Sequence, residues 1–275
     1  MKIAYQGVKG AFSELAAKST YPDYERQRYA SFQDVFNAVE NNQADLGIIP
    51  IENSYAGRVD QIHNILAKTK LNIIGEYILP IKHFLLGVEG AELQDITTAY
   101  SHPQALMQCS NNLSDLGITG EPSSNTAVAA KEVAKLKNKS IAAIGSALAA
   151  EEYGLKVLKQ EMQDSLDNMT VFVIVSKQAF FPEENKGKVL TSMVYTIRNI
   201  PAALYKSLGG FATNNVNMIK LESYIPAGPN KKAQFFICFE GHPSQDNVKR
   251  AVEELGFYCS KTKILGVYYA DPRRS

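Results

Sequence analysis

Polar side chains of this chain gather in five short segments that could carry chemistry. The segments are 7–14 (GVKGAFSE), 50–58 (PIENSYAGR), 101–106 (SHPQAL), 122–127 (PSSNTA) and 164–172 (DSLDNMTVF). Their hydroxyl, amide, carboxyl and imidazole groups donate and accept hydrogen bonds, which is the chemistry of holding a small polar molecule. The glycines of the first segment precede an expected helix, whose free N–H groups could bind an anion such as a carboxylate.

Each segment also has a purely structural interpretation, and the residues alone leave both interpretations open. Segments 7–14, 101–106 and 122–127 are typical of turns that lead into a helix with a capping side chain. Segment 164–172 is typical of a turn into a buried strand, and segment 50–58 is equally typical of a polar loop. Taken one at a time, none of them predicts a ligand site.

The elements expected around these segments alternate between strands and helices. Strands are predicted at Ile3–Tyr5, Asp45–Pro50, Asn72–Leu79, Lys82–Val88, Ile96–Tyr100, Ser140–Ile144 and Thr170–Ser176. Helices are predicted at Ala11–Ser19, after the capping residue Ser31, and at Val59–Ala67, Pro103–Leu116, Thr126–Leu136 and Ser146–Glu152. The alternation predicts an α/β architecture with largely parallel sheets, in which ligand sites lie beyond the carboxyl ends of strands.

Residues 177–188 (KQAFFPEENKGK) interrupt this pattern with proline, glycine and dense charge, and predict a domain boundary. Beyond them, strands are predicted at Val189–Ile197, Val216–Tyr224, Ala233–Glu240 and Lys261–Tyr269, helices at Ile200–Ala212 and Pro243–Leu255, and a turn at Pro226–Asn230. This βαββαβ order is that of a ferredoxin-like domain.

Composition excludes several classes of protein. The 275 residues predict roughly two domains, and a hydrophobic content of 45% excludes disorder along the whole chain. The 29 basic and 28 acidic residues nearly cancel, which argues against nucleic acid as a partner. Cys109, Cys238 and Cys259 are too far apart to predict a disulfide framework or a zinc site. Without a signal peptide or an apolar run of ~18–20 residues, we expect a cytoplasmic protein and no membrane partner.

Taken together, the segments resemble the prephenate dehydratase family. The matching motifs are Gly7…Gly10-Ala11-Phe12-Ser13-Glu14, Pro50-Ile51-Glu52-Asn53-Ser54 with Gly57, Ser101-His102-Pro103-Gln104-Ala105-Leu106, Thr126-Ala127 and Asn168-x-Thr170-x-Phe172. They follow one another in the family's order, and the βαββαβ segment resembles an ACT domain, a small regulatory module that binds amino acids. The resemblance covers nearly the whole chain.

The resemblance implies an enzyme that converts prephenate to phenylpyruvate in phenylalanine biosynthesis, with no metal or organic cofactor. It implies a catalytic domain at 1–177, a linker at 178–188 and an ACT domain at 189–275. The catalytic domain would have two lobes like a type II periplasmic binding protein, one of about 1–75 plus 170–177 and one of about 76–169. Phenylalanine bound at ACT contacts between subunits of a homodimer or homotetramer would be the allosteric effector. Arogenate dehydratase and a non-catalytic protein that binds or senses a small carboxylate are the alternatives.

The family's functional residues map onto this chain by motif. Thr170 is expected to be catalytic, donating a hydrogen bond to the departing hydroxyl group. The expected substrate-binding residues are Gly10, Phe12, Ser13, Glu52, Asn53, Ser54, Gly57, Ser101, His102, Thr126, Ala127 and Phe172. The expected contacts of regulatory phenylalanine are Ala203, Leu204, Asn217, Glu222 and Ser223.

Several positions depart from the family's motifs, among them Val171, Ala202 and Tyr224. Val171 replaces the arginine of Thr-Arg-Phe, and so lacks a cation that could pair with a carboxylate. Either Arg58 or a lysine such as Lys9 supplies that charge, or the enzyme is weakened or altered. We favour retained dehydratase activity, because the other motifs stand, and we predict that Val171→Arg raises kcat/KM for prephenate. Ala202 and Tyr224 replace a glycine and an arginine of the ACT motifs, which leaves inhibition by phenylalanine open.

Overall fold

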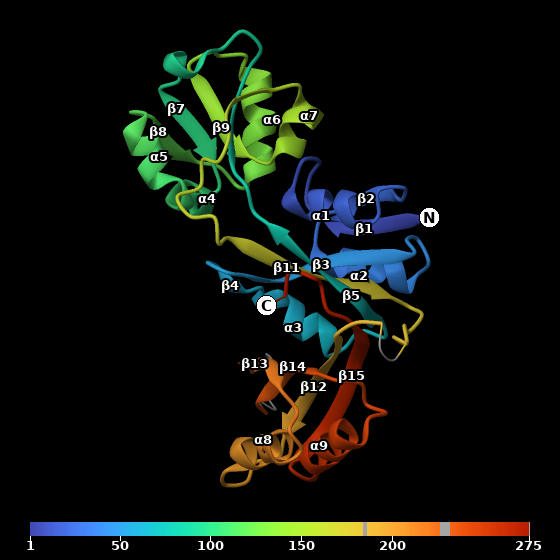
Figure 1. Ribbon diagram of the computed structural model, residues 1–275. Coiled ribbons are helices and arrows are strands. Elements are labelled where there is room, and N and C mark those ends of the chain that lie inside the picture. Colours follow the sequence, from blue (N-terminus) through green and yellow to red (C-terminus); the bar gives the residue numbers. More distant parts are fainter. Residues whose placement is uncertain (184–185, 226–231, 275) are drawn as a thin grey trace. The chain divides into compact units, whose positions relative to one another are not determined.

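The computed structural model describes residues 1–183, 186–225 and 232–274, and these form three β-sheets with helices packed on them (Figure 1). The chain divides into two compact units. Unit 1 contains Met1–Val35, Ile48–Arg58 and Ile78–Phe172, and unit 2 contains Phe36–Gly47, Val59–Tyr77 and Val173–Ser275. The boundaries predicted for the catalytic lobes, the linker and the ACT domain stay a prediction.

The first sheet has the strand order β2-β1-β3-β11-β5, with the short strand β4 paired to β3. Its strands are β1 (Lys2–Gln6), β2 (Glu25–Tyr29), β3 (Leu46–Asn53), β4 (Gly57–Arg58), β5 (Asn72–Pro80) and β11 (Met169–Ser176), and the helices between them in the chain are α1 (Phe12–Thr20), α2 (Phe32–Glu40) and α3 (Asp60–Leu66). β3 and β11 are apolar and buried along most of their length, which is typical of central strands. The polar ends of these two strands therefore emerge together at one edge of the sheet.

The second sheet lies within unit 1 and has the order β10-β6-β9-β7-β8. Its strands are β6 (Phe84–Gly87), β7 (Thr98–Ser101), β8 (Thr119–Pro122), β9 (Ile141–Gly145) and β10 (Lys156–Lys159); its helices are η1 (Leu93–Asp95), α4 (Pro103–Gln108), α5 (Ser110–Asp115), α6 (Thr126–Leu136) and α7 (Ala147–Tyr153). β7 pairs in parallel with β8 and β9, whereas β6 is antiparallel to β9. Alanines on α6 and β9 let helix and sheet approach closely in the core.

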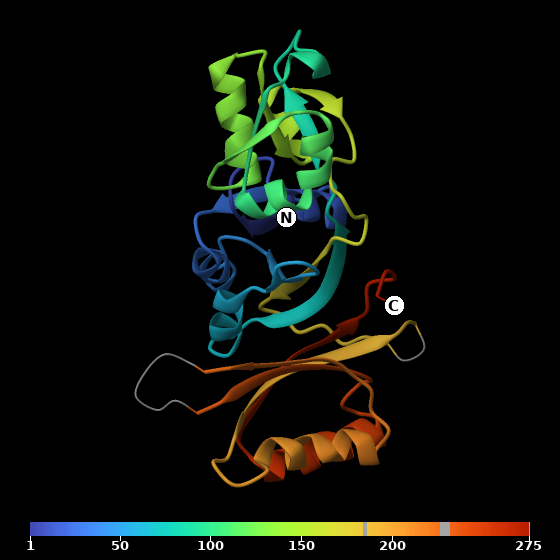
Figure 2. The ribbon, with the colours of Figure 1, turned by 90° about the vertical axis from the view of Figure 1, so that its left-hand side faces the viewer.

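The third sheet lies within unit 2 and has the order β13-β14-β12-β15. Its elements are β12 (Val189–Ile197), α8 (Ala203–Thr213), β13 (Met218–Tyr224), β14 (Gln234–Glu240), α9 (Asp246–Phe257) and β15 (Cys259–Tyr269). All of its pairings are antiparallel. Figure 2 shows α8 and α9 side by side on one face of this sheet, where Phe211, Phe239 and Leu255 form part of the core.

These sheets confirm the predicted α/β class and the C-terminal βαββαβ segment. The single helix predicted at Pro103–Leu116 is wrong, because it is divided at Cys109 into α4 and α5. The cause lies far away in the sequence: the carboxylate of Asp164 accepts hydrogen bonds from the backbone N–H groups of Asn111 and Asn112, at 3.1 and 3.2 Å, and so caps a new helix. The turn predicted at Pro226–Asn230 lies outside the described residues.

No helix in the described ranges is long and apolar enough to cross a membrane. All three cysteines are buried and unpaired.

Candidate active site

A cavity of about 270 Å³ in unit 1 opens where the polar ends of β3 and β11 meet the first turns of helices. The residues that line it are Phe12, Ser13, Pro50, Asn53, Ala56, Ile81, His83, His102, Gln104, Ala105, Gln108, Asn125, Thr126, Asn168, Thr170 and Phe172. Five segments of the sequence are thus brought to one place. Because residues two apart on a strand share a face, β11 presents Thr170 and Phe172 to the cavity on the same side.

Asn53 is the best-anchored polar side chain of this cavity. Its Oδ1 accepts hydrogen bonds from the backbone N–H groups of Tyr55 and Ala56, at 3.0 and 2.9 Å. Because a backbone N–H can only donate, these two bonds fix which end of the amide is oxygen. The Nδ2 group must therefore point toward β11, where it donates to Oδ1 of Asn168 at 2.8 Å and to Oγ of Thr170 at 3.0 Å.

Thr170 receives a hydrogen bond in this arrangement, and its own proton stays available. The side chain is 8% exposed, and the amide nitrogen of Asn53 cannot accept a proton from it. A hydroxyl that accepts from one side can donate more strongly on the other, because the two bonds polarise one another. Thr170 is thus a positioned donor toward a ligand in the cavity.

Helix N-termini, and not lysine or arginine side chains, are the groups at this cavity that favour an anion. None of the residues that line it, all of which are described, is lysine or arginine. α1 begins at Phe12 and α6 at Thr126, so the N-terminal ends of two helices adjoin the cavity. The first turn of a helix leaves N–H groups without helical partners and carries partial positive charge, which favours a carboxylate.

Seven of the residues predicted from the motifs line this cavity. They are Phe12, Ser13, Asn53, His102, Thr126, Thr170 and Phe172. The imidazole of His102 accepts a hydrogen bond at Nδ1 from the backbone of Gln104, at 3.2 Å, and caps α4.

The other predicted binding residues lie outside the lining, in supporting positions. Ser101 is fully buried and donates to the carbonyl of Ile144 at 2.7 Å. Ser54 is exposed, and its backbone N–H donates to the carbonyl of Met169 at 2.9 Å. Glu52 and Gly57 belong to the β3–β4 pair, where Glu52 lies opposite Arg58 and Gly57 lies opposite Asn53. Ala127 is buried in α6.

Gly10 illustrates how such a position supports the site. Its φ of +79° is unfavourable for other residues, and a Cβ there would lie 2.7 Å from Cα of Ala149. Its carbonyl accepts from Oγ of Ser146 at 2.7 Å, and its N–H donates to Glu14 at 2.7 Å. Glycine is therefore required for the close packing of the loop before α1 on the start of α7.

The two cations considered as replacements for the family's arginine do not line the cavity. Arg58 is exposed on β4, and Lys9 lies 3.3 Å from the carboxylate of Glu152. Val171 is not among the lining residues either, because its side chain leaves β11 on the face opposite to Thr170 and Phe172.

Sequence reasoning missed several residues that line the cavity, above all His83 and Gln108. His83 stands alone just before a short apolar strand, and Gln108 ends a helix, so neither has a local pattern that indicates a site. Oε1 of Gln108 lies 2.9 Å from Nδ2 of Asn168 and 3.2 Å from Nε2 of His83. Burial lowers the pKa of His83, and the hydrogen bond to Gln108 opposes this only in part.

The predicted regulatory residues are spread over the third sheet and α8. Ala203 is buried and Leu204 half-buried at the start of α8. The carboxylate of Glu222 lies 2.8 Å from Nε2 of His63 on α3 and 2.8 Å from Nζ of Lys220. Ser223 follows in β13 and is exposed.

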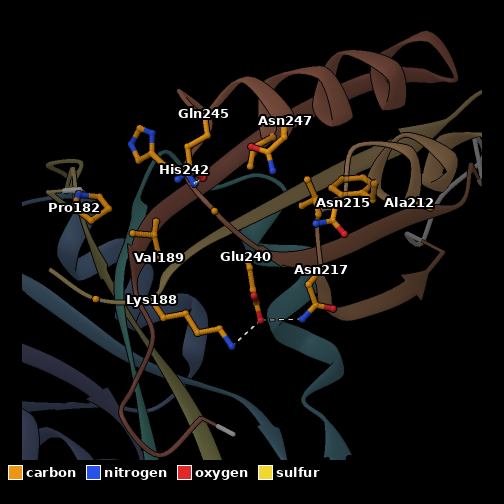
Figure 3. A pocket seen from close by; sticks show the side chains of 15 residues that line it. Pro182, Lys188, Val189, Ala212, Asn215, Asn217, Glu240, His242, Gln245 and Asn247 are labelled. Carbon is orange, nitrogen blue, oxygen red and sulfur yellow. Dashed lines mark hydrogen bonds and ion pairs between the residues drawn. The ribbon is translucent and has the colours of Figure 1, made fainter. Parts of the chain in front are cut away.

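Asn217 lines a second cavity, of about 820 Å³, in unit 2. Figure 3 shows its Nδ2 donating to Oε1 of Glu240, at 2.9 Å, with Nζ of Lys188 2.6 Å from the same oxygen. These hydrogen bonds lower the pKa of Glu240. The charges of Lys188 and Glu240 are thus paired with each other.

Comparison with known proteins agrees with the motifs. The sequence profile described as PDT, prephenate dehydratase, matches residues 3–180, which include every residue that lines the first cavity. A bifunctional N-acyl-homoserine lactone acylase/prephenate dehydratase of Komagataeibacter europaeus is 39% identical over 273 residues, covering 99% of this chain and 97% of that protein. Arogenate dehydratase 2 of Petunia hybrida is 35% identical over 291 residues, covering 98% and 72%. The solved structure of prephenate dehydratase in complex with L-Phe from Arthrobacter aurescens is 29% identical, with a TM-score of 0.89 over 98% of this chain and 90% of that one.

Proposed function

This chain belongs to the prephenate dehydratase family, and we propose that it catalyses the decarboxylating dehydration of prephenate to phenylpyruvate. Prephenate carries a ring carboxylate, a pyruvyl carboxylate and a ring hydroxyl group. The C–C bond to the ring carboxylate breaks and releases CO₂, its electron pair enters the ring, and the C–O bond breaks with its pair on oxygen. The products are phenylpyruvate, CO₂ and hydroxide, which takes a proton from solvent to become water.

Formation of the aromatic ring drives this reaction, so the enzyme has to orient the substrate and stabilise the departing oxygen. The cavity of about 270 Å³ is lined by uncharged donors and adjoined by the N-terminal ends of α1 and α6, which suits a dicarboxylate. Phe12 and Phe172 would pack on the ring. His102 would act through its cap of α4, since the reaction requires no base.

The observation that carries this proposal is the hydrogen bond from Asn53 to Thr170, 3.0 Å long. Because the oxygen of Thr170 accepts this bond, its own O–H can donate to a ligand in the cavity. Departing hydroxide is stabilised by such a donor. Hydrogen-bond donation explains the residue better than full protonation does, because a threonine hydroxyl is a very weak acid.

The test is phenylpyruvate formation from prephenate by the purified protein, with Thr170→Ala and Thr170→Ser in parallel. Removal of one donor to a developing oxyanion typically lowers kcat by about 10²–10³. We expect that loss in Thr170→Ala and retention of most of the activity in Thr170→Ser. Equal activity of Thr170→Ala and the unaltered protein would refute the assigned role.

Arogenate, which bears an ammonium group in place of the keto oxygen, is the second substrate of this assay. A relative that is an arogenate dehydratase is 35% identical to this chain, which makes the comparison necessary. Turnover of arogenate alone would make the protein an arogenate dehydratase. Turnover of neither compound by folded protein would favour a protein that binds or senses a small carboxylate.

Regulation by phenylalanine forms part of the proposal. It is supported by the βαββαβ segment and by the similar solved structure that contains L-Phe. We assign to this segment the role of an ACT domain that binds phenylalanine between subunits of a cytoplasmic homo-oligomer, with Ala203, Leu204, Asn217, Glu222 and Ser223 as contact residues.

A further inference from the structure

His83 is buried, at 2% exposure, and lines the first cavity, yet one of its ring nitrogens has no hydrogen-bond partner among the described residues. Its backbone is held on both sides: the N–H donates to Oε1 of Gln163 at 2.8 Å, and the carbonyl accepts from the N–H of Met162 at 2.9 Å. The ring meets Phe12, another lining residue, edge to face at a centroid distance of 5.5 Å. The imidazole is therefore fixed in place at the wall of the cavity.

The tautomer of His83 follows from a chain of amide groups that begins at the backbone. Oδ1 of Asn53 is fixed by two backbone N–H donors, so its Nδ2 donates to Oδ1 of Asn168. Nδ2 of Asn168 then donates to Oε1 of Gln108, which turns that oxygen toward Nε2 of His83.

An amide oxygen can only accept, so Nε2 of His83 must carry the proton. In a neutral imidazole Nδ1 is then a hydrogen-bond acceptor. Nδ1 is buried and has no hydrogen-bond partner in the described part of the chain. A buried acceptor without a partner is costly, and sites that keep one commonly satisfy it with a ligand.

We propose that Nδ1 of His83 accepts a hydrogen bond from the ring hydroxyl group of the substrate, an inference that rests on the proposed function. At neutral pH prephenate has two carboxylates and a keto group, which only accept, and one proton donor, the ring hydroxyl. An acceptor in the cavity can therefore serve only that group. Held in this way, the hydroxyl oxygen turns its lone pairs toward the donor Thr170.

This bond acts mainly on substrate binding. As the C–O bond breaks, the oxygen becomes negative and its hydrogen becomes a weaker donor. The bond to His83 therefore orients the ground state, whereas Thr170 acts on the departing hydroxide. No proton passes to His83.

Two substitutions of His83 test the roles of its two ring nitrogens separately. Gln at this position keeps an N–H near the place of Nε2, able to reach Gln108, but has no acceptor at the place of Nδ1. Asn keeps an acceptor near the place of Nδ1 but loses the bond to Gln108. We would combine each substitution with Thr170→Ala, which slows turnover so that prephenate is not consumed during the measurement. Ligand affinity would then be measured by calorimetry.

Loss of one hydrogen bond of about 1 kcal/mol weakens binding about fivefold. We expect His83→Gln to weaken prephenate binding about fivefold and to leave phenylpyruvate binding unchanged, because phenylpyruvate has no ring hydroxyl. His83→Asn should retain more of the affinity for prephenate than His83→Gln does. If the role of His83 were merely structural, its substitution would weaken the binding of both ligands alike.

An equal loss of affinity for both ligands in His83→Gln, or no loss of affinity for either, would overturn the role of His83. Loss for arogenate alone would assign Nδ1 to the ammonium group and would also overturn it. Turnover of prephenate by the unaltered protein, measured alongside, tests the proposed function separately. An active enzyme with unchanged affinities would refute only the inference about His83, whereas a protein that neither binds nor turns over prephenate would refute both.

Discussion

At position 171 a valine lies between two residues that line the cavity, but its side chain leaves β11 on the other face. The sequence suggested that Val171→Arg would raise kcat/KM by restoring a lost cation. The geometry predicts otherwise, because an arginine there would start away from the substrate, and two helix N-termini already favour its carboxylates. We expect kcat/KM for prephenate to stay within about twofold of the unaltered enzyme, a change of under about 0.5 kcal/mol.

The comparison for this variant is Val171→Leu, which alters packing without adding charge. A rise in kcat/KM of about tenfold in Val171→Arg alone, worth about 1.4 kcal/mol, would mean that the guanidinium reaches a carboxylate around the strand.

Site residues could be predicted from the sequence where they stand in a local motif, and not where they act through contacts with distant residues. Thr170 and Asn53 stand in motifs whose order along the chain carried the resemblance, and both line the cavity. Ser101 belongs to a motif too, yet its hydroxyl donates a hydrogen bond to a backbone carbonyl of a neighbouring strand and not to the cavity. His83 and Gln108 contribute through contacts with residues 25 and 60 positions away, which no local pattern reveals.

Among the elements, α8 begins with a residue in a strained conformation. Ala202, before its first turn, has a φ of +59°, where a Cβ is unfavourable and glycine is not. Position 202, where the family's motif has glycine, thus has an alanine in a conformation that favours glycine. We expect Ala202→Gly to raise the free energy of unfolding by up to about 1 kcal/mol, measured by urea denaturation.

The matched control lies in the same helix. Ala212 is exposed within α8, where glycine is a poor helix former, so Ala212→Gly should lower the free energy of unfolding by about 1 kcal/mol. Destabilisation by both substitutions would show that the left-handed conformation at 202 is not strained in solution.

A second prediction at this scale concerns the carboxylate of Glu222 on β13, which contacts His63 on α3 and Lys220 on β13. Burial raises the pKa of Glu222, but hydrogen bonds from His63 and Lys220 outweigh it and lower the pKa to about 2, from an ordinary 4.5. Folding therefore favours the ionised carboxylate, and the stabilisation is complete above about pH 4.5 and lost as the pH falls toward 2. A shift of this size corresponds to about 3 kcal/mol.

Unfolding free energies of the unaltered protein and Glu222→Gln between pH 6 and pH 3 test this point. The difference between the two free energies should shrink as the pH falls. Protonation of Glu222 removes the negative charge in the unaltered protein, and glutamine lacks that charge at every pH. His63→Gln should show a weaker pH dependence than the unaltered protein. Parallel profiles would contradict the role assigned to the ionised carboxylate of Glu222.

The strands that the sequence analysis missed are short strands with little apolar pattern. β2, β8 and β10 are each the last strand of their sheet, and their sequences, ERQRY, TGEP and KVLK, carry little apolar signal. Edge strands are half solvated and pair on one side only, so polar residues suit them. The break between α4 and α5 was likewise hidden, because its cap, Asp164, comes from a distant loop.

For the whole molecule, the positions of the proposed regulatory residues argue for assembly. Asn217 and Glu222 are five residues apart along an extended segment, roughly 16 Å at about 3.3 Å per residue, which is longer than one phenylalanine. Two phenylalanine molecules at a symmetric contact between two copies would reach both residues more readily than one molecule within a single chain.

β13 offers the surface for such a contact. It is an edge strand of the third sheet, and Leu221 on it is 39% exposed, whereas β15 at the other edge packs closely on β5 at Gly266. We expect Leu221→Lys to convert the proposed homo-oligomer to monomers in sedimentation velocity, since a charge on an edge strand opposes pairing. Phenylalanine should then no longer raise the Tm of the protein or inhibit it, while prephenate turnover persists, because the cavity lies in the other unit.

Tyr205→Lys is the control for this variant. Tyr205 is 81% exposed on α8, so the same charge is added away from the strand edge, and both assembly and the response to phenylalanine should be kept. An unaltered protein that is monomeric and still binds phenylalanine would contradict the argument, since the effector would then have a complete site within one chain. Loss of assembly with an unchanged response to phenylalanine would contradict it too, because the edge of β13 would then join subunits without forming the site.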